Sequence, residues 1–303
     1  MLQRLVNHWF RQRARQAVTQ AVVGAVAQSG RQGAGPQPAS GSAQPPQENP
    51  PPDVAVVFAL AAESGGLVDR LRDVVTTRCA TFVDRSGHWK GRRILVVETG
   101  VGSVAAHRAT EDMLAVHRPP LVISAGFAGG LSDRLERGDI VMANALIDRS
   151  GHTLSLGLKG DFGARGTASR LHVGPLLTVP ALVRTPAEKR QLFQQHAALA
   201  CDMESFAVAR ACQQAHTPLL AVRVISDAAG DELPPEVSRL LDQTSLAGKL
   251  GAATGALVRR PSSLKDLWRL KADALQASDR LAKFLLSMFA QLPGPPTPHE
   301  PEA

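Results

Sequence analysis

The chain of 303 residues is long enough for one large domain or two small ones, and its low aromatic content, with no tyrosine, predicts a core of aliphatic side chains. Its three cysteines are scattered along the sequence, which excludes a disulfide framework and a metal knuckle and favours a reducing, cytoplasmic location. The net charge of +7 invites a nucleic-acid partner, but no segment interleaves arginine with aromatic residues, so we expect none.

The first 28 residues form a basic amphipathic segment. Its apolar side chains share one helical stripe, with arginines on the other side; the stripe consists of Leu2, Leu5, Val6, Trp9 and Phe10. Such a helix suits an anionic membrane surface, and a packing helix, a partner helix or a poorly ordered tail fits the same pattern. Residues 29–52 have the Gly-, Pro-, Gln- and Ser-rich composition of a linker, so we treat 1–52 as a separate region.

From residue 53 onward, short apolar runs alternate with amphipathic segments. We expect strands at residues 54–59, 78–83, 92–97, 121–125, from 138, at 171–179 and at 219–227, with a turn at 86–88 between the second and third. We expect helices around Glu63 and residues 67–71, at 103–117, 186–197 and 203–215, and at about 235–258. This alternation predicts an α/β fold over residues 53–258: a three-layer sandwich with a twisted, mostly parallel but mixed central sheet.

Residues 259–303 are expected to form an amphipathic helix followed by a disordered, proline-rich tail. The apolar side of this helix consists of Leu267, Trp268, Leu275, Leu281, Phe284, Leu285, Met288 and Phe289. We expect the helix to dock on the core. Pairing with the N-terminal helix, or contact with a membrane, is the alternative.

Two glycine clusters follow consecutive predicted strands. Residues 100–105 fit the G-x-G-x-x-A outline of a dinucleotide-binding turn. That fingerprint also needs an acid at the end of the next strand, and residues 123–126 contain none, so we set a dinucleotide aside. The second cluster spans residues 126–130. Either cluster alone fits an ordinary tight turn, but two at neighbouring strand ends indicate loops that let a ligand approach the backbone.

Three carboxylates, those of Glu63, Glu204 and Asp227, stand at strand ends or helix starts. Each alone is typical of a helix-dipole partner or a cap. Because ligands bind at the carboxyl ends of the strands in open α/β sheets, the three together indicate a cleft lined by carboxylates. Such a cleft suits chemistry at a sugar carbon. One acid protonates the leaving group, another activates water, and fixed negative charge stabilises an oxocarbenium-like transition state.

Six short motifs in this part of the chain carry a resemblance to a known family. They are residues 59–63, 99–102, 124–131, 138–141, 202–204 and 223–227. In this order they resemble the nucleoside phosphorylase superfamily, and within it the 5′-methylthioadenosine/S-adenosylhomocysteine nucleosidases. The resemblance implies a phosphorylase/hydrolase-like fold, an enzyme without metal or cofactor, a nucleoside substrate and a homodimer.

The resemblance also implies roles for individual residues. Asp227, oriented by Ser226, would share a proton with N7 of the purine, and burial against aliphatic strand ends would favour its protonated form. Glu63, with Arg223 nearby, would hold and deprotonate the attacking water. Glu204 would accept hydrogen bonds from the ribose 2′ and 3′ hydroxyls.

The remaining side chains implied in binding surround the sugar and the base. Met203 would pack on the ribose, Ala128 and Gly129 would line the base through their backbone, and Leu182 and Val183 would lie at its edge. Phe127 departs from the family pattern, which has a small hydroxyl residue near the water. Residues 148–185 match poorly, and in the family this region shapes the pocket for the 5′ substituent.

The sequence therefore predicts an N-glycosyl hydrolase that releases adenine from a 5′-substituted adenosine. Phosphorolytic cleavage on the same fold is one alternative, with His107 and Arg108 as candidate phosphate ligands. Cleavage of an adenosylated lipid, such as a hopanoid precursor at a membrane surface, is another, because both flanks of the domain are amphipathic. An alternative of a different class is a nucleoside-binding protein without activity.

Overall fold

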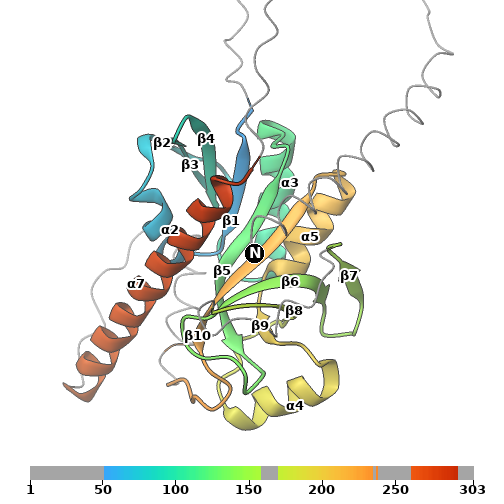
Figure 1. Cartoon of the computed structure of the whole chain (residues 1–303), viewed down its shortest axis with the longest axis vertical. Helices are drawn as coiled ribbons and strands as arrows, with labels where there is room; N and C mark the ends of the chain where they lie inside the picture. Colours follow the sequence, from blue (N-terminus) through green and yellow to red (C-terminus); the bar gives the residue numbers. More distant parts are fainter. Residues whose placement is uncertain (1–50, 158–169, 235–236, 238–260, 293–303) are drawn as a thin grey trace, which may run out of the picture.

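The computed structural model describes residues 51–157, 170–234, 237 and 261–292 (Figure 1). The predicted N-terminal helix and the predicted helix at 235–258 lie outside the described residues, apart from Val237. Of the helices that the structure describes, none combines the length and apolar character needed to cross a bilayer.

The strands form one mixed sheet whose centre is parallel. Its four central strands are β4 (Arg92–Glu98), β1 (Val54–Phe58), β5 (Val122–Gly130) and β10 (Leu219–Asp227), in that order. Beyond β4 the sheet continues with two antiparallel strands, β3 (Val83–Trp89) and β2 (Arg72–Arg78). The carboxyl ends of the central parallel strands thus lie at one edge of the sheet, as the sequence predicts.

At its other side the sheet closes on itself. This part contains β6 (Ile140–Ile147), β8 (Leu171–Thr178) and β9 (Ala200–Asp202), with the short β7 (Thr153–Ser155) paired to β6. Strand β10 pairs with both β5 and β6, β8 pairs with both β6 and β9, and β9 pairs back to β5. The ring brings the short strand β9 next to the end of β5, and so places residues 200–202 beside the glycine-rich segment.

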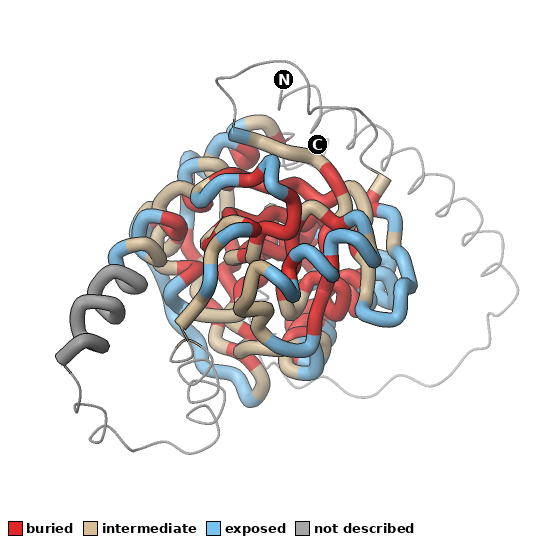
Figure 2. Tube along the Cα trace, turned by 90° about the horizontal axis from the view of Figure 1, so that it is seen from below, coloured by how far each residue is buried: buried red, intermediate tan, exposed pale blue. Residues whose placement is uncertain are grey.

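Helices cover both faces of the sheet. Successive residues of β1 point to opposite faces: Val54, Val56 and Phe58 pack with α2 (Ala61–Val68) and α7 (Pro261–Phe289), whereas Ala55 and Val57 pack with α3 (Ser103–His117) and α5 (Ser205–Gln214). Figure 1 shows these two pairs of helices on either side of the sheet, and Figure 2 shows the buried residues gathered in the interior of the molecule. The predicted three-layer α/β architecture is confirmed.

Several predicted boundaries are wrong. The predicted strand at 78–83 instead covers the end of β2, the connection after it and the start of β3. Strand β3 runs through Gly87, so there is no turn at 86–88, and the chain turns at Lys90 and Gly91, both with positive φ. Gly87 is needed for close packing, since a Cβ there would lie 3.0 Å from the Leu71 side chain. Strand β9 was not predicted, and β5 continues through the second glycine cluster, so that cluster is not a loop.

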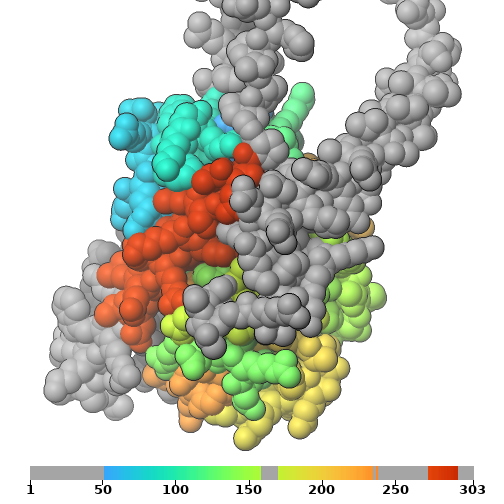
Figure 3. Space-filling view, viewed as in Figure 1, coloured from blue at the N-terminus to red at the C-terminus, as the bar shows by residue number. Residues whose placement is uncertain are grey.

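The predicted docking of the C-terminal helix on the core is confirmed. The apolar side of α7 is buried in the same cluster as β1 and α2; its buried members include Ala277, Leu281, Leu285, Met288 and Phe289. Leu275 is exposed. In the space-filling view α7 lies against the blue and cyan residues of the first third of the described chain (Figure 3).

Helices α2 and α7 meet at a glycine and a serine. The Ser278 hydroxyl donates to the Glu63 carbonyl and accepts from the Gly66 N–H, both at 2.9 Å. A Cβ at Gly66 would lie 2.7 Å from the Ser278 carbonyl oxygen, which is backbone and cannot move aside alone. The neighbouring Gly65 has open space at the same position.

We therefore expect opposite effects from two adjacent substitutions in α2. Gly66→Ala forces α7 away from α2 and lowers the free energy of unfolding by about 1–3 kcal/mol. Gly65→Ala meets no atoms and raises it by about 0.5–1 kcal/mol, because alanine is the better helix former. Urea unfolding of both variants checks this, and a Gly66→Ala variant as stable as Gly65→Ala would contradict the packing described for α7.

Candidate active site

The three carboxylates singled out in the sequence each lie at or just after the end of a strand of the sheet. Glu63 is in the first turn of α2, directly after β1, and Asp227 is the last residue of β10. Glu204 is the N-cap residue of α5, which follows β9. Glu63 and Glu204 are each fixed by a short connection between a strand and a helix, and Asp227 is fixed by the strand that it ends.

Glu63 is buried and held by backbone amides. Its Oε2 accepts from the N–H groups of Ala59 and Leu60, both at 3.0 Å, and its Oε1 accepts from the Phe127 N–H at 2.8 Å. Burial raises the pKa of this carboxyl, while the three amides and the charge of Arg223 oppose the shift. Glu63 is thus an oriented carboxylate with increased affinity for a proton, and Oε1 keeps a free lone pair.

Two glycines of β5 make room for carboxylates. A Cβ at Gly126 would lie 2.6 Å from Glu63 Oε1, and one at Gly129 would lie 3.1 Å from Asp227 Oδ2. The two glycines are three residues apart in extended chain, which corresponds to about 10 Å. The glycine cluster therefore admits two acidic side chains of the protein, one at each end of the segment.

Asp227 is buried between a serine and a lysine. The Ser226 hydroxyl donates to Oδ1 at 2.6 Å, and the Lys189 ammonium of α4 (Pro186–His196) donates to Oδ2 at 2.6 Å. The predicted contact between Ser226 and Asp227 is present. The sequence indicated only the aliphatic strand ends as surroundings of Asp227, whereas the structure also places a fully buried cation, Lys189, in contact with it.

Glu204 lies beside other acids. Its Oε1 accepts from the Gly102 N–H at 2.8 Å, which ties α5 to the start of α3. Burial raises its pKa to about 8, and the charges of Asp202 and Glu63 add to the shift. The first glycine cluster therefore holds this carboxylate through its backbone.

Arg223 is buried beneath the carboxylates. Its guanidinium binds the Asp202 carboxylate, with Nε at 2.9 Å from Oδ2, and donates to the hydroxyls of Ser124 and Ser205 at 2.9 and 2.7 Å. The sequence placed Arg223 beside Glu63 as a partner for water. In the structure its hydrogen bonds go to Asp202, Ser124, Ser205 and a backbone carbonyl, and its effect on Glu63 is electrostatic.

The smaller predicted binding residues fall into two groups. Met203 and Val183 pack on one apolar cluster that includes Cys201 of β9. Leu182 is half-buried next to Val183, in the loop before α4. On β5, the Phe127 side chain packs toward α2 and α7 while its N–H holds Glu63, and the Ala128 carbonyl lies 3.2 Å from the Ser226 hydroxyl. The structure therefore places Ala128 and Gly129 next to Ser226 and Asp227.

Lys189 and Asp202 are charged residues that the sequence reading did not place in the site. Asp202 belongs to the motif at residues 202–204. The feature that could have identified it is its position at the end of a short buried strand, where it binds Arg223. Lys189 gives a weaker signal: it is three residues from Leu192 on the same helix, so the two share a face, and Leu192 is also buried. Neither position predicts its partner without the three-dimensional pairing.

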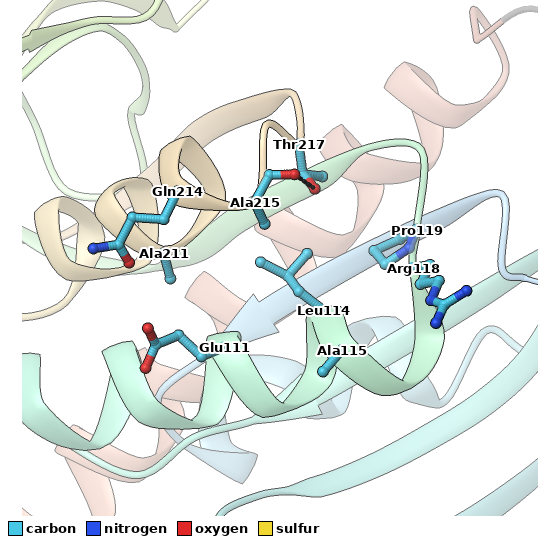
Figure 4. Close-up of a pocket in the computed structure, with 9 residues that line it drawn as sticks. All are labelled: Glu111, Leu114, Ala115, Arg118, Pro119, Ala211, Gln214, Ala215 and Thr217. Carbon is cyan, nitrogen blue, oxygen red and sulfur yellow. Dashed lines mark hydrogen bonds between the residues drawn. The ribbon is translucent and has the colours of Figure 1, made fainter. Parts of the chain in front are cut away.

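One surface hollow lies at the opposite end of the helices that carry Gly102 and Glu204. It has a volume of 430 Å³ and lies between the C-terminal turns of α3 and α5; Glu111, Leu114, Arg118, Gln214 and Thr217 are among its lining residues (Figure 4). Helix α3 has 15 residues and so spans about 22 Å, which separates this hollow from the carboxylates.

A sequence profile of the phosphorylase superfamily matches residues 54–259. The chain belongs to this superfamily. The family resemblance of the six motifs is thereby confirmed, and with it the expectation of an enzyme. The match begins at β1 and ends just before α7.

Individual relatives are more distant. The 5′-methylthioadenosine/S-adenosylhomocysteine nucleosidases of Shewanella piezotolerans and Shewanella sediminis are 24% and 25% identical, over 59% and 62% of this chain and 87% and 91% of their own. Among solved structures, the corresponding nucleosidase of Helicobacter pylori has a TM-score of 0.60 at 19% identity, covering 80% of this chain and 100% of its own. Futalosine hydrolase of the same organism has a TM-score of 0.57 at 19% identity, covering 79% and 97%. These likenesses show the shared fold.

The raised pKa of Glu204 predicts how stability depends on pH. Between its ordinary value of 4.5 and about 8, the folded protein holds a proton that the unfolded chain has released. The free energy of unfolding therefore falls as pH rises through this window. We expect Glu204→Gln to gain stability relative to the wild-type protein between about pH 5 and pH 8, as measured by urea unfolding at both values.

Glu188 provides a matched control on α4. Its pKa is lowered by hydrogen bonds from Thr185, so its contribution is already complete at pH 5 and stays constant above it. Glu188→Gln should thus change stability equally at both pH values. A Glu204→Gln variant that behaves like this control would show that the folded state does not retain the proton.

Proposed function

We propose that this protein hydrolyses the N-glycosidic bond of a 5′-substituted adenosine and releases adenine. The observation that carries the proposal is the placement of Glu63: a buried carboxylate on three backbone amides, with one oxygen lone pair free. Such a group can accept a hydrogen bond from a water molecule and then take its proton.

The other carboxylates complete the chemistry. Asp227 would protonate the departing purine at N7, so that the base leaves as a neutral molecule. Glu204, held by the Gly102 amide, would accept hydrogen bonds from the ribose hydroxyls, and Met203 would pack on the sugar. Water held by Glu63 would then attack the anomeric carbon as positive charge develops there, and Glu63 would take the proton released.

Hydrolysis is favoured over phosphorolysis by charge. The Ala59, Leu60 and Phe127 amides form the kind of backbone site that can bind a phosphate oxygen, but here they bind the Glu63 carboxylate. A phosphate at this position would be repelled by the charge of Glu63, and these three amides would not be free to donate hydrogen bonds to it. Arg108 is exposed on α3, and His107 beside it lies 3.6 Å from Glu111.

The 5′ substituent is proposed from the relatives. The similar proteins from Shewanella are named for methylthioadenosine and S-adenosylhomocysteine, which supports a thioether at this position. A futalosine-type nucleoside or an adenosylated lipid would use the same carboxylates. The homodimer, the cytoplasmic location and membrane contact by the terminal segments stay predictions.

The proposal predicts adenine release from 5′-methylthioadenosine at a rate that does not depend on phosphate. Product analysis by chromatography, in buffer with and without phosphate, measures both the base and the sugar. Free 5-methylthioribose is expected in each case. A requirement for phosphate, with a sugar 1-phosphate as product, would overturn hydrolysis.

Substitution of the two acids distinguishes an enzyme from a nucleoside-binding protein. We expect Glu63→Gln and Asp227→Asn each to lower kcat at least about 100-fold, the usual contribution of one acid or base, while a substrate analogue still binds. Calorimetry gives binding and adenine release gives turnover, with Glu188→Gln as the control on an exposed acid. If the wild-type protein binds the analogue but releases no adenine from the substrate, the proposed enzyme activity is refuted and a nucleoside-binding function is the one supported.

A further inference from the structure

Lys189 is a fully buried lysine for which the family roles considered above have no use. Its Nζ lies 2.6 Å from Asp227 Oδ2, 2.7 Å from the Ala228 carbonyl oxygen and 2.9 Å from the Asp231 carbonyl oxygen. An ammonium has three hydrogens and needs three acceptors. The geometry therefore supplies a complete set of partners for a protonated lysine away from solvent.

The same contacts leave Asp227 without a proton of its own to give. Oδ2 accepts from Lys189, and Oδ1 accepts from the Ser226 hydroxyl at 2.6 Å, which is shorter than the 3.2 Å to the Ala128 carbonyl. The carboxylate thus forms an ion pair with an ammonium on one oxygen and accepts from a hydroxyl on the other, so both oxygens are engaged as acceptors. A purine leaving group nevertheless needs a proton, so a neighbour of Asp227 has to supply it.

Only two described side chains donate to Asp227, those of Ser226 and Lys189. Loss of the proton from a serine would leave a charged alkoxide, whereas loss of one proton from the lysine ammonium leaves a neutral amine. We propose that Lys189 is the positioning residue of Asp227 and the source of the proton that Asp227 passes to the base. This inference rests on the proposed hydrolysis.

The proton transfers balance. As the bond from the anomeric carbon to N9 breaks, its electron pair moves into the purine and N7 takes a proton from Asp227. Asp227 receives one from Lys189 Nζ, which becomes a neutral amine. Water adds to the anomeric carbon and gives its proton to Glu63. After the products leave, solvent returns one proton to Lys189 and removes one from Glu63, so the protein is restored and one water is consumed.

Other charged or titratable groups face this pair from the surrounding elements. Cys201 on β9 has a pKa raised by burial and, secondarily, by the charge of Asp227. Asp202 acts on the same thiol, and Arg137 and Asp231 form an ion pair at the outer side, with Arg137 Nε 2.7 Å from Asp231 Oδ2. Among the described residues, Lys189 is the cation that contacts Asp227 directly.

Two substitutions separate proton supply from charge alone. Arginine at position 189 can keep the positive charge and the hydrogen bond, but it does not release a proton. Lys189→Arg should therefore lower kcat for 5′-methylthioadenosine about 10²–10⁴-fold. Lys189→Met removes the charge and lets Asp227 take a proton from solvent, so it should retain more activity than Lys189→Arg at acidic pH and lose it as pH rises.

A substrate that needs no leaving-group proton provides the second measurement. With p-nitrophenyl 5-methylthioribofuranoside, whose phenolate departs as an anion, Lys189→Arg should keep kcat within a few-fold of the wild-type protein. Arg190→Met, an exposed substitution on the same helix, should change neither substrate. Thermal unfolding by circular dichroism verifies that each variant is folded.

The outcomes are distinct. Lys189→Arg at least as active as Lys189→Met on methylthioadenosine would show that charge suffices and would overturn the proton supply. An equal loss on both substrates would show a structural role and would also overturn it. Wild-type protein inactive on both substrates would instead refute the proposed hydrolysis, independently of Lys189.

Discussion

The burial of several acids at one end of the sheet is the constraint on which the rest of the site depends. Among the described residues, the carboxylates of Glu63, Asp202, Glu204 and Asp227 share this end with two buried cations, Arg223 and Lys189. Burying a charge without a partner is very costly. Burial raises the pKa values of Glu63 and Glu204, and for Glu204 the charges of Asp202 and Glu63 add to the effect of burial. The carboxylates that are ionised at this end can stabilise a cationic, oxocarbenium-like transition state.

The two candidate acid–base residues have opposite surroundings. Asp227 contacts a cation, whereas the hydrogen bonds that Glu63 accepts from the described part of the chain come from neutral amides, and the charge of Arg223 acts on it electrostatically. Groups whose environments differ in this way can play different roles at one pH. In our proposal the cation beside Asp227 is itself a proton donor, so the pair acts as the acid. Glu63, desolvated but with a free lone pair, acts as the base. The spacing between them is set by β5, whose Gly126 and Gly129 each admit one carboxylate.

The sequence predicts the parts of this structure that depend on local patterns. The continuous apolar run of β1 and the amphipathic helix at 103–117 were recognisable because each local pattern reflects burial. Pairings between distant segments could not be found in this way. Gly87 resembles a turn residue, although its role is to let Leu71 pack against a strand. Lys189 resembles one more charge on an exposed helix, although β10 and its following turn surround its ammonium with acceptors.

Helix α7 shows that the support of the site extends past the family-matched region. It begins after residue 259, where the profile ends, yet its apolar side completes the core beneath α2. The Ser278 hydroxyl bonds the carbonyl of Glu63 itself and the amide of Gly66 one turn later. Helix α2 is short, and a short helix depends on tertiary packing for its stability. The orientation of the Glu63 carboxylate against β5 therefore depends in part on a helix at the other end of the chain.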